Sequence, residues 1–225
     1  MNKTVLITGF RKFGVYRCNP TETLVENLKG KNLGGFQIFG KLFDSSMTVA
    51  NAGPEGHCGE IISHLVTVFG ASAVVSLGMW STISGIRFES RCSNWVHNDK
   101  YCKSGENNRP IVGTRPPKEI IGLDLRPWNI PSIQKKLRRA EIPFEAEISQ
   151  DAGGFCCNAL MYLASRALKN HRRQVPFMFA HVPCTKEAVK GLSVEQFNPE
   201  GKVILTDSEL ETALLVILQN LTLAG

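Results

Sequence analysis

The chain has 225 residues, of which 43% are hydrophobic and 20% charged, and its glycines and prolines are scattered rather than clustered. This profile excludes a disordered or fibrous protein and leaves enough chain to bury the core of one α/β-sized domain. Lys and Arg number 26 against 20 for Asp and Glu, an excess too small and too dispersed to indicate nucleic-acid binding.

Short apolar runs, rich in β-branched or aromatic residues, alternate with helical patterns along the chain. In chain order, the predicted strands are residues 4–8, 36–43, 73–77, 83–91, 144–148 and 177–182. The predicted helices are residues 21–29, 58–69, 133–140, 157–169 and 208–221. The alternation predicts one α/β domain over residues 1–225, a three-layer α/β/α sandwich with a largely parallel, partly mixed central sheet.

No stretch of the sequence has the length of an export or membrane signal. The opening apolar run ends at Gly9, and about 18 consecutive apolar residues occur nowhere in the chain. We therefore expect a cytoplasmic protein with no membrane partner. The seven cysteines have no regular spacing, which predicts reduced thiols rather than a disulfide framework.

Two polar segments fall outside the repeating pattern. Residues 94–117 contain Gly and Pro and show little periodicity, which indicates a long surface loop rather than a linker between domains. A basic cluster, Lys135, Lys136, Arg138 and Arg139, lies on a helical pattern, where a solvated face is the simplest interpretation. We expect no nucleic-acid partner.

The most informative stretch runs from a strand pattern through Gly153 and Gly154 into a helix that opens near Cys157. A cysteine there is close to the positive end of the helix dipole and to first-turn amides, which favour a thiolate and can bind an oxyanion. This is the arrangement of a nucleophile elbow, although the G-x-S-x-G signature is absent. Cys156 and Cys157 would point in different directions, so at most one faces a site; alternatively, both are small buried hydrophobes.

A thiolate needs a base, and His181 is the candidate. It ends a predicted strand and precedes Pro183, at the carboxyl edge of the sheet where open α/β proteins place their sites. Because Cys157 also follows a strand, we expect the two side chains to meet across neighbouring strands. The alternative is a structural histidine at a strand end.

Glu89 is the candidate for the group that orients this imidazole. Apolar residues alternate with it, which predicts a carboxylate at the margin of the core that would fix the tautomer of His181. The alternative is a salt bridge to Arg87 or Arg91. No metal-site spacing, Cys-x-x-Cys or Gly-rich phosphate motif is present, so we expect no metal and no cofactor.

These segments together resemble the pyroglutamyl peptidase I family of cytosolic cysteine peptidases, also called pyrrolidone carboxyl peptidases. The likeness covers nearly the whole chain. It rests on four motifs: the opening TGFRKFG with the following Asn-Pro, the segment ending at Glu89, SQDAGGFCCN at 149–158 and HVP at 181–183. It implies a catalytic triad of Cys157, His181 and Glu89.

The resemblance also implies a pocket for the lactam ring of the substrate. The substrate-binding residues that we predict on this basis are Phe10, Phe13, Asn19 and Met79. The chain departs from many bacterial members around this pocket, at Val15, at Met79, at residues 81–83 and at Ser90. None of these departures falls on the three triad positions.

The implied reaction is hydrolytic removal of an amino-terminal pyroglutamyl (5-oxoprolyl) residue from a peptide substrate, through an acyl-enzyme on Cys157. One alternative keeps the triad but prefers another acyl group, and a second is a non-catalytic binding or thiol-sensing homologue. Family members form tetramers, which leaves open a homo-oligomer, a dimer or a tetramer. The carboxyl-terminal pattern of leucines at 210, 214, 215 and 218 instead indicates a helix face packed on the sheet.

Overall fold

The computed structural model describes residues 3–44, 58–83, 85–97, 108–142, 145–198, 200 and 204–223. Its helices are α1 (Pro20–Leu28), α2 (Cys58–Phe69), α3 (Ile130–Arg139), α4 (Cys156–Lys169), α5 (Lys186–Val189) and α6 (Asp207–Gln219), with a short 3-10 helix at Arg126–Trp128. Its strands are β1 (Lys3–Phe10), β2 (Asn32–Leu33), β3 (Phe36–Phe43), β4 (Ala73–Met79), β5 (Gly85–Glu89), β6 (Arg91–Ser93), β7 (Ile120–Gly122), β8 (Glu145–Ser149) and β9 (Phe177–Val182).

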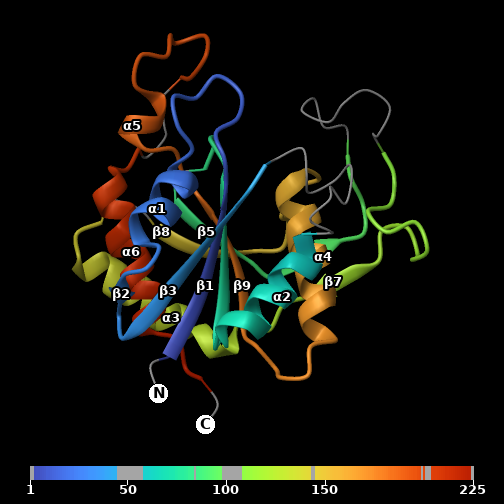
Figure 1. Cartoon of the computed structure of the whole chain (residues 1–225). Coiled ribbons are helices and arrows are strands. Elements are labelled where there is room, and N and C mark those ends of the chain that lie inside the picture. The colour runs from blue at the N-terminus through green and yellow to red at the C-terminus, as the bar shows by residue number, and fades with distance from the viewer. Residues whose placement is uncertain are drawn as a thin grey trace.

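Seven strands form one sheet in the order β2-β3-β1-β4-β9-β5-β8, and β6 pairs with β7 in a separate ribbon (Figure 1). Strands β3, β1, β4 and β9 are parallel, whereas β5 and β8 run together in the opposite direction, with β5 antiparallel to β9. Strands β4 and β9 are buried along their whole length, because helices cover both faces of the sheet. This explains why both strands are apolar runs in the sequence, with one polar residue each.

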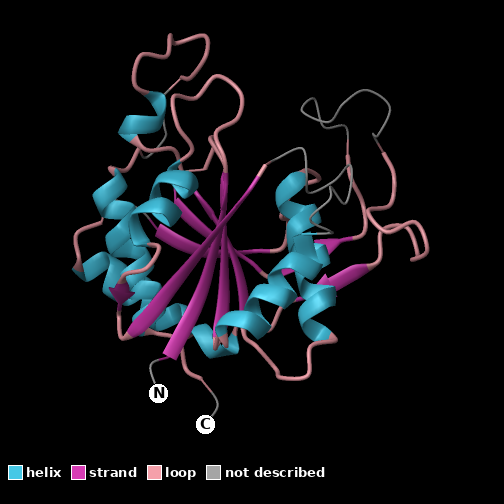
Figure 2. Ribbon diagram, in the orientation of Figure 1, coloured by secondary structure: helices cyan, strands magenta, loops and turns pink. Residues whose placement is uncertain are grey.

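Alternate side chains of the central strands enter two separate hydrophobic cores. On β9, Met178 and Ala180 belong to the core that contains α1, α3 and α6, whereas Phe177 and Phe179 belong to the core that contains α2 and α4. Figure 2 shows these two helical layers on opposite sides of the sheet. The predicted three-layer α/β/α sandwich with a partly mixed sheet is confirmed.

The predicted helix at 58–69 and the predicted strands at 36–43 and 177–182 have the observed bounds. The strand predicted at 83–91 is too long, because β5 stops at Glu89 and the chain then turns into β6. Strands as short as β6 and β7 have too few residues for a period to be recognised in the sequence. Residue 144, the first of the strand predicted at 144–148, lies outside the described residues.

The carboxyl-terminal helix α6 packs on the sheet through its leucines. Leu210, Leu214 and Leu218 are at most 2% exposed and lie in the same core as α1 and α3, which confirms the predicted helix face at these positions. Leu215, the fourth residue of that predicted face, is only half-buried. A homo-oligomer stays a prediction. Among the helices that the structure describes, none is both long enough and apolar enough to span a bilayer.

The predicted surface loop at 94–117 is described except for residues 98–107, and its described parts are joined by a buried asparagine. Oδ1 of Asn94 accepts a hydrogen bond from the amide of Val112 at 2.8 Å, and Nδ2 donates to the carbonyl of Pro116 at 3.0 Å. Asn94 is fully buried, so these bonds replace the water that its amide group would otherwise bind.

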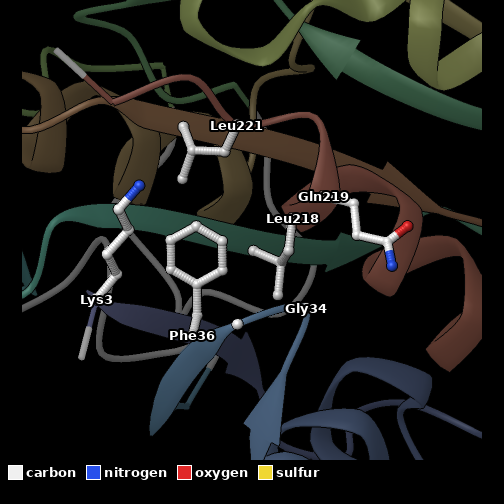
Figure 3. Close-up of a pocket in the computed structure, with 7 residues that line it drawn as sticks. Lys3, Gly34, Phe36, Leu218, Gln219 and Leu221 are labelled. Atoms are coloured by element: carbon white, nitrogen blue, oxygen red, sulfur yellow. The ribbon is translucent and has the colours of Figure 1, made fainter.

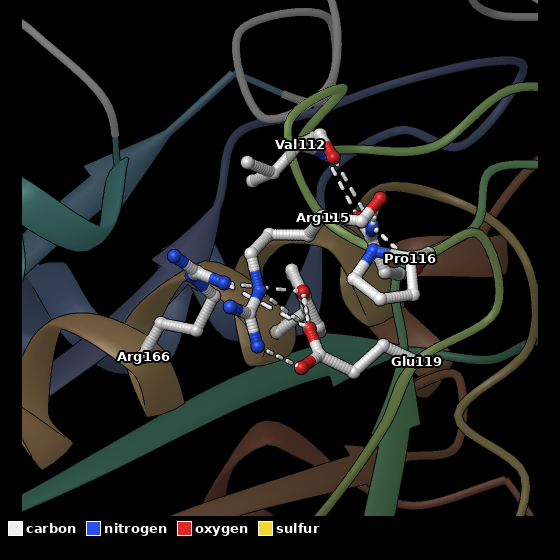
Figure 4. A network of polar contacts seen from close by, with 7 residues as sticks. Val112, Arg115, Pro116, Glu119 and Arg166 are labelled. Carbon is white, nitrogen blue, oxygen red and sulfur yellow. Dashed lines mark hydrogen bonds and ion pairs between the residues drawn. The ribbon is translucent and has the colours of Figure 1, made fainter.

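An ionic cluster fastens the end of this loop to α4 (Figure 4). The carboxylate of Glu119 accepts hydrogen bonds from the guanidinium of Arg115 and from the hydroxyl of Tyr162, and Nη1 of Arg166 lies 3.8 Å from Oε2 of Glu119. The bonds from Arg115 and Tyr162 lower the pKa of Glu119 from 4.5 to about 2. The carboxylate is therefore favoured in its ionised form by the fold.

This lowered pKa predicts an acid-sensitive contribution to stability. It is fully present above the ordinary pKa of Glu119, and it is lost as the pH falls from there through the folded-state pKa of about 2. We expect Glu119→Gln to be less stable than the wild type at neutral pH and to show a shallower loss of stability in this acid range. Thermal unfolding followed by circular dichroism from neutral to acid pH measures both, and parallel pH profiles for the two proteins would contradict the assignment.

A cavity of about 450 Å³ lies at the amino-terminal end of the parallel strands (Figure 3). Its wall includes Lys3 and Phe36, the first residues of β1 and β3, together with Leu218 and Leu221. Because His181 stands near the carboxyl end of β9, this cavity is at the opposite end of the sheet from the candidate catalytic residues.

Candidate active site

The alternation of side chains along two strands places His181 and Glu89 on the face of the sheet that α4 covers. His181 is two residues after Phe179 and therefore shares its face of the sheet, toward α2 and α4. Glu89 directly follows Phe88, which faces the other layer, so Glu89 is on the same face as His181. Strands β5 and β9 are antiparallel, with Glu89 opposite Phe179 and Arg87 opposite His181. Glu89 therefore lies diagonally beside His181 on one face.

The two side chains share a short hydrogen bond in a buried environment. Nδ1 of His181 lies 2.8 Å from Oε1 of Glu89, and the side chains are 2% and 0% exposed. Because an ionised carboxylate can only accept, the proton lies on Nδ1 and Nε2 is the proton acceptor of the ring. Burial lowers the pKa of His181; the carboxylate of Glu89 acts in the opposite direction.

Cys157 reaches the same point from the start of α4. It is the second residue of the helix, whose N-cap residue Phe155 provides no side-chain oxygen to cap the first amides. A Cβ atom built on Gly78 would lie 2.8 Å from Sγ of Cys157 and 3.2 Å from Cδ2 of His181. The thiol and the imidazole thus both lie beside one backbone position of β4 that a glycine leaves open.

The route by which Cys157 reaches His181 differs from the prediction. The expectation that the two side chains meet across neighbouring strands is wrong, because β5 lies between β8 and β9 and β8 runs opposite to β9. The six-residue connection 150–155 carries the chain from the end of β8 onto the face of the sheet, and α4 then begins beside β4 and β9.

This connection is held by its own polar groups and by the start of the helix. The amide of Asp151 donates to Oγ of Ser149 at 3.1 Å, and the amide of Gly153 donates to Oδ1 of Asp151 at 2.9 Å. Gly153 has φ +74°, which a residue with a side chain rarely adopts. The buried side chain of Asn158 exchanges two hydrogen bonds with the backbone of Ser93, at 2.9 and 3.0 Å.

Comparison with known proteins identifies the family. A sequence profile described as pyroglutamyl peptidase matches residues 3–80 and 127–200. The chain belongs to the pyroglutamyl peptidase family. It is 30% identical over 192 residues to a pyrrolidone-carboxylate peptidase of Bacillus cereus, covering 82% of this chain and 80% of the relative. A relative of the same name from Oceanobacillus iheyensis is 26% identical over 199 residues, 87% of this chain and 91% of the relative.

A crystal structure of a pyrrolidone carboxyl peptidase from Pyrococcus furiosus has the same fold. It superposes with a TM-score of 0.75 at 23% identity and covers 96% of each chain. The family predicted from the sequence motifs is therefore confirmed. The part of the family profile that precedes residue 80 includes β1 and β4, and the part that follows residue 127 includes α4 and β9.

The predicted substrate-binding residues of this family member fall into two groups. Phe10 ends β1 and packs in the core that Cys157 borders, and Met79 ends β4 in a small apolar cluster that half-buried Phe13 contacts. Asn19 is buried and caps α1, where its Oδ1 accepts a hydrogen bond from the amide of Thr21 at 3.0 Å. Phe10, Phe13 and Met79 thus stand at the carboxyl ends of β1 and β4, whereas the observed contacts of Asn19 are structural.

Sequence reasoning did not single out Trp80 or assign a position to Arg87. The Trp80 ring stands edge-on to the His181 ring, with centroids 4.9 Å apart, and the Arg87 guanidinium carbon lies 4.8 Å from the centroid of the Trp80 ring. An aromatic residue directly after a buried strand was the only signal for Trp80. Within the described residues, no three His, Cys, Asp or Glu side chains converge in a way that could hold a metal ion.

Proposed function

We propose that this protein hydrolyses the amide bond that follows an amino-terminal pyroglutamyl residue, through an acyl-enzyme on Cys157. The observation that carries the proposal is that Cys157 and His181 both lie beside Gly78, while Glu89 is hydrogen-bonded to Nδ1 of the imidazole. A nucleophile, a base and a group that orients the base are the parts that acyl transfer requires. Membership of the pyroglutamyl peptidase family supports the same reaction.

The roles follow from the positions of the atoms. Nε2 of His181 accepts the proton of Cys157 as Sγ attacks the pyroglutamyl carbonyl, and Nδ1 stays bonded to Glu89. First-turn amides of α4 stabilise the oxyanion of the tetrahedral intermediate. Nε2 then returns the proton to the leaving amine, and water releases the acyl group by the same steps with His181 as base.

The chemistry of the substrate fits the apolar surroundings of the thiol. A pyroglutamyl residue has no charged amine, because its amino group is closed into a lactam. Phe10, Phe13 and Met79 provide apolar side chains at the carboxyl ends of β1 and β4, and a lactam can pack against such side chains without a counter-ion. A free amino terminus would lose its hydration there and be rejected.

One assay separates this proposal from its alternatives. The purified protein is incubated with a pyroglutamyl amide that releases a fluorescent amine, and with matched alanyl, prolyl and glutamyl amides, each with and without iodoacetamide. We expect hydrolysis of the pyroglutamyl amide alone, and its loss after alkylation. Preference for another amide would indicate a changed acyl specificity, and no hydrolysis of any amide would indicate a binding or thiol-sensing protein.

A further inference from the structure

Arg87 has a position that neither the family assignment nor the three proposed catalytic residues account for. It occupies the middle of a row of paired residues across three strands, with His181 of β9 on one side and Glu147 of β8 on the other. Its side chain is on the same face as His181 and Glu89, and 21% of it is exposed.

The guanidinium of Arg87 is held in one place by several contacts. Nη2 donates to Oγ of Ser149 at 2.7 Å, and Nε lies 3.2 Å from Oε1 of Glu147. The guanidinium stands over the Trp80 ring, which itself stacks edge-on against His181. Ser149 also accepts a hydrogen bond from the amide of Asp151, so Arg87 is linked through Ser149 to the connection that leads to α4.

The charge of Arg87 matters because Glu89 is completely buried. One carboxylate oxygen of Glu89 bonds to His181, and the other has no hydrogen-bond partner within the part of the chain that the structure describes. A buried carboxylate is costly without an opposite charge nearby. Nε of Arg87 lies 4.0 Å from Oε1 of Glu89, close enough to supply that charge.

We propose that Arg87 is a positioning residue of the active site, which balances the charge of Glu89 and so keeps His181 uncharged until it accepts the proton of Cys157. This role rests on the proposed peptidase function. Without Arg87, protonation of His181 would supply the positive charge that compensates the buried carboxylate of Glu89. A protonated imidazole cannot act as the base.

Several other charged or titratable groups also face His181 and contribute to its protonation. Glu89 and Arg87 face it from β5, Asp151 acts on it from the connection after β8, and Cys157 faces it from α4. The neighbouring rings of Trp80 and Phe179 carry no charge. Removal of Arg87 takes away a positive charge and leaves two carboxylates, which favours the charged imidazole.

The test compares Arg87→Gln and Arg87→Lys with Arg126→Gln, a control that removes a remote, exposed arginine that contacts Asp124. Titration of the His181 ring by NMR, in the presence of a Cys157→Ala replacement, gives its protonation midpoint without any turnover. The pH profile of kcat/KM is measured with Cys157 intact. Thermal unfolding shows whether each variant is folded.

We expect Arg87→Gln to move the His181 midpoint and the acid limb of kcat/KM to higher pH, with a loss on the order of tenfold below the midpoint and little change on the alkaline plateau. Arg87→Lys keeps the charge and should stay near the wild type, as should Arg126→Gln. An unmoved midpoint in Arg87→Gln, or equal shifts in the Gln and Lys variants, would overturn the proposal. Absence of hydrolysis by the wild type would overturn the peptidase function alone.

Discussion

The Cys157→Ala variant is expected to lose hydrolysis of pyroglutamyl amides by about 10,000-fold or more, the scale on which removal of a catalytic nucleophile acts. Its fold should survive, because the half-buried side chain only becomes smaller by one sulfur atom. Steady-state assays with a fluorogenic pyroglutamyl amide measure the loss, and circular dichroism with thermal unfolding establishes that the variant is folded.

The adjacent thiol provides a matched control. Cys156 precedes Cys157 at the start of α4 and is also half-buried, so Cys156→Ala removes the same atoms from a neighbouring position. We expect Cys156→Ala to keep activity close to that of the wild type. Similar losses in the two variants would show that the helix start as a whole, and not one sulfur atom, is required.

The Gly78→Ala variant is expected to lose about a hundredfold or more in kcat without unfolding. The added methyl group would lie 2.8 Å from Sγ of Cys157, 3.0 Å from Phe179 and 3.2 Å from His181. The His181 ring is fixed by its bond to Glu89, and Phe179 is completely buried, so the thiol is the group that must move. Overpacking of this kind costs about 1 to 3 kcal/mol of stability.

Gly122 offers the corresponding control for the loss of a glycine. It lies in β7, and a Cβ built there meets no atom within 4 Å. Gly122→Ala should therefore leave both kcat and the unfolding temperature near their wild-type values. A Gly78→Ala enzyme with unchanged kcat would mean that the thiol does not act from the position seen in the structure.

The layers of the fold were open to prediction because they depend on local patterns. The apolar runs of β4 and β9 contain no polar alternation, which is typical of strands covered on both faces. The helix at 58–69 ends at a clear signal, because a glycine follows it directly. The candidate nucleophile, base and carboxylate could be named because each stands in a short motif at the end of such an element.

The order of the strands, and which of them run antiparallel, could not be predicted, since both are set by contacts between distant parts of the chain. Nothing within residues 144–149 reveals that β8 pairs with β5 and runs opposite to β9. The contacts of Arg87 with Trp80 and Ser149 depend on that register, and so they were missed, whereas its ion pair with Glu89 was one of the two alternatives that the sequence offered. Asn19 shows the converse case, because its sequence position next to Pro20 is also that of a helix cap, which is the contact observed.

The division of the sheet into two cores separates the chemistry from half of the molecule. His181, Glu89 and Cys157 all lie toward α2 and α4, while the core formed by α1, α3 and α6 contains none of them. Replacements inside the core of α1, α3 and α6 change the free energy of unfolding. They can affect the thiol only through the sheet, which lies between this core and Cys157. Heat tolerance and turnover of this protein could therefore be engineered, and could evolve, largely independently of each other.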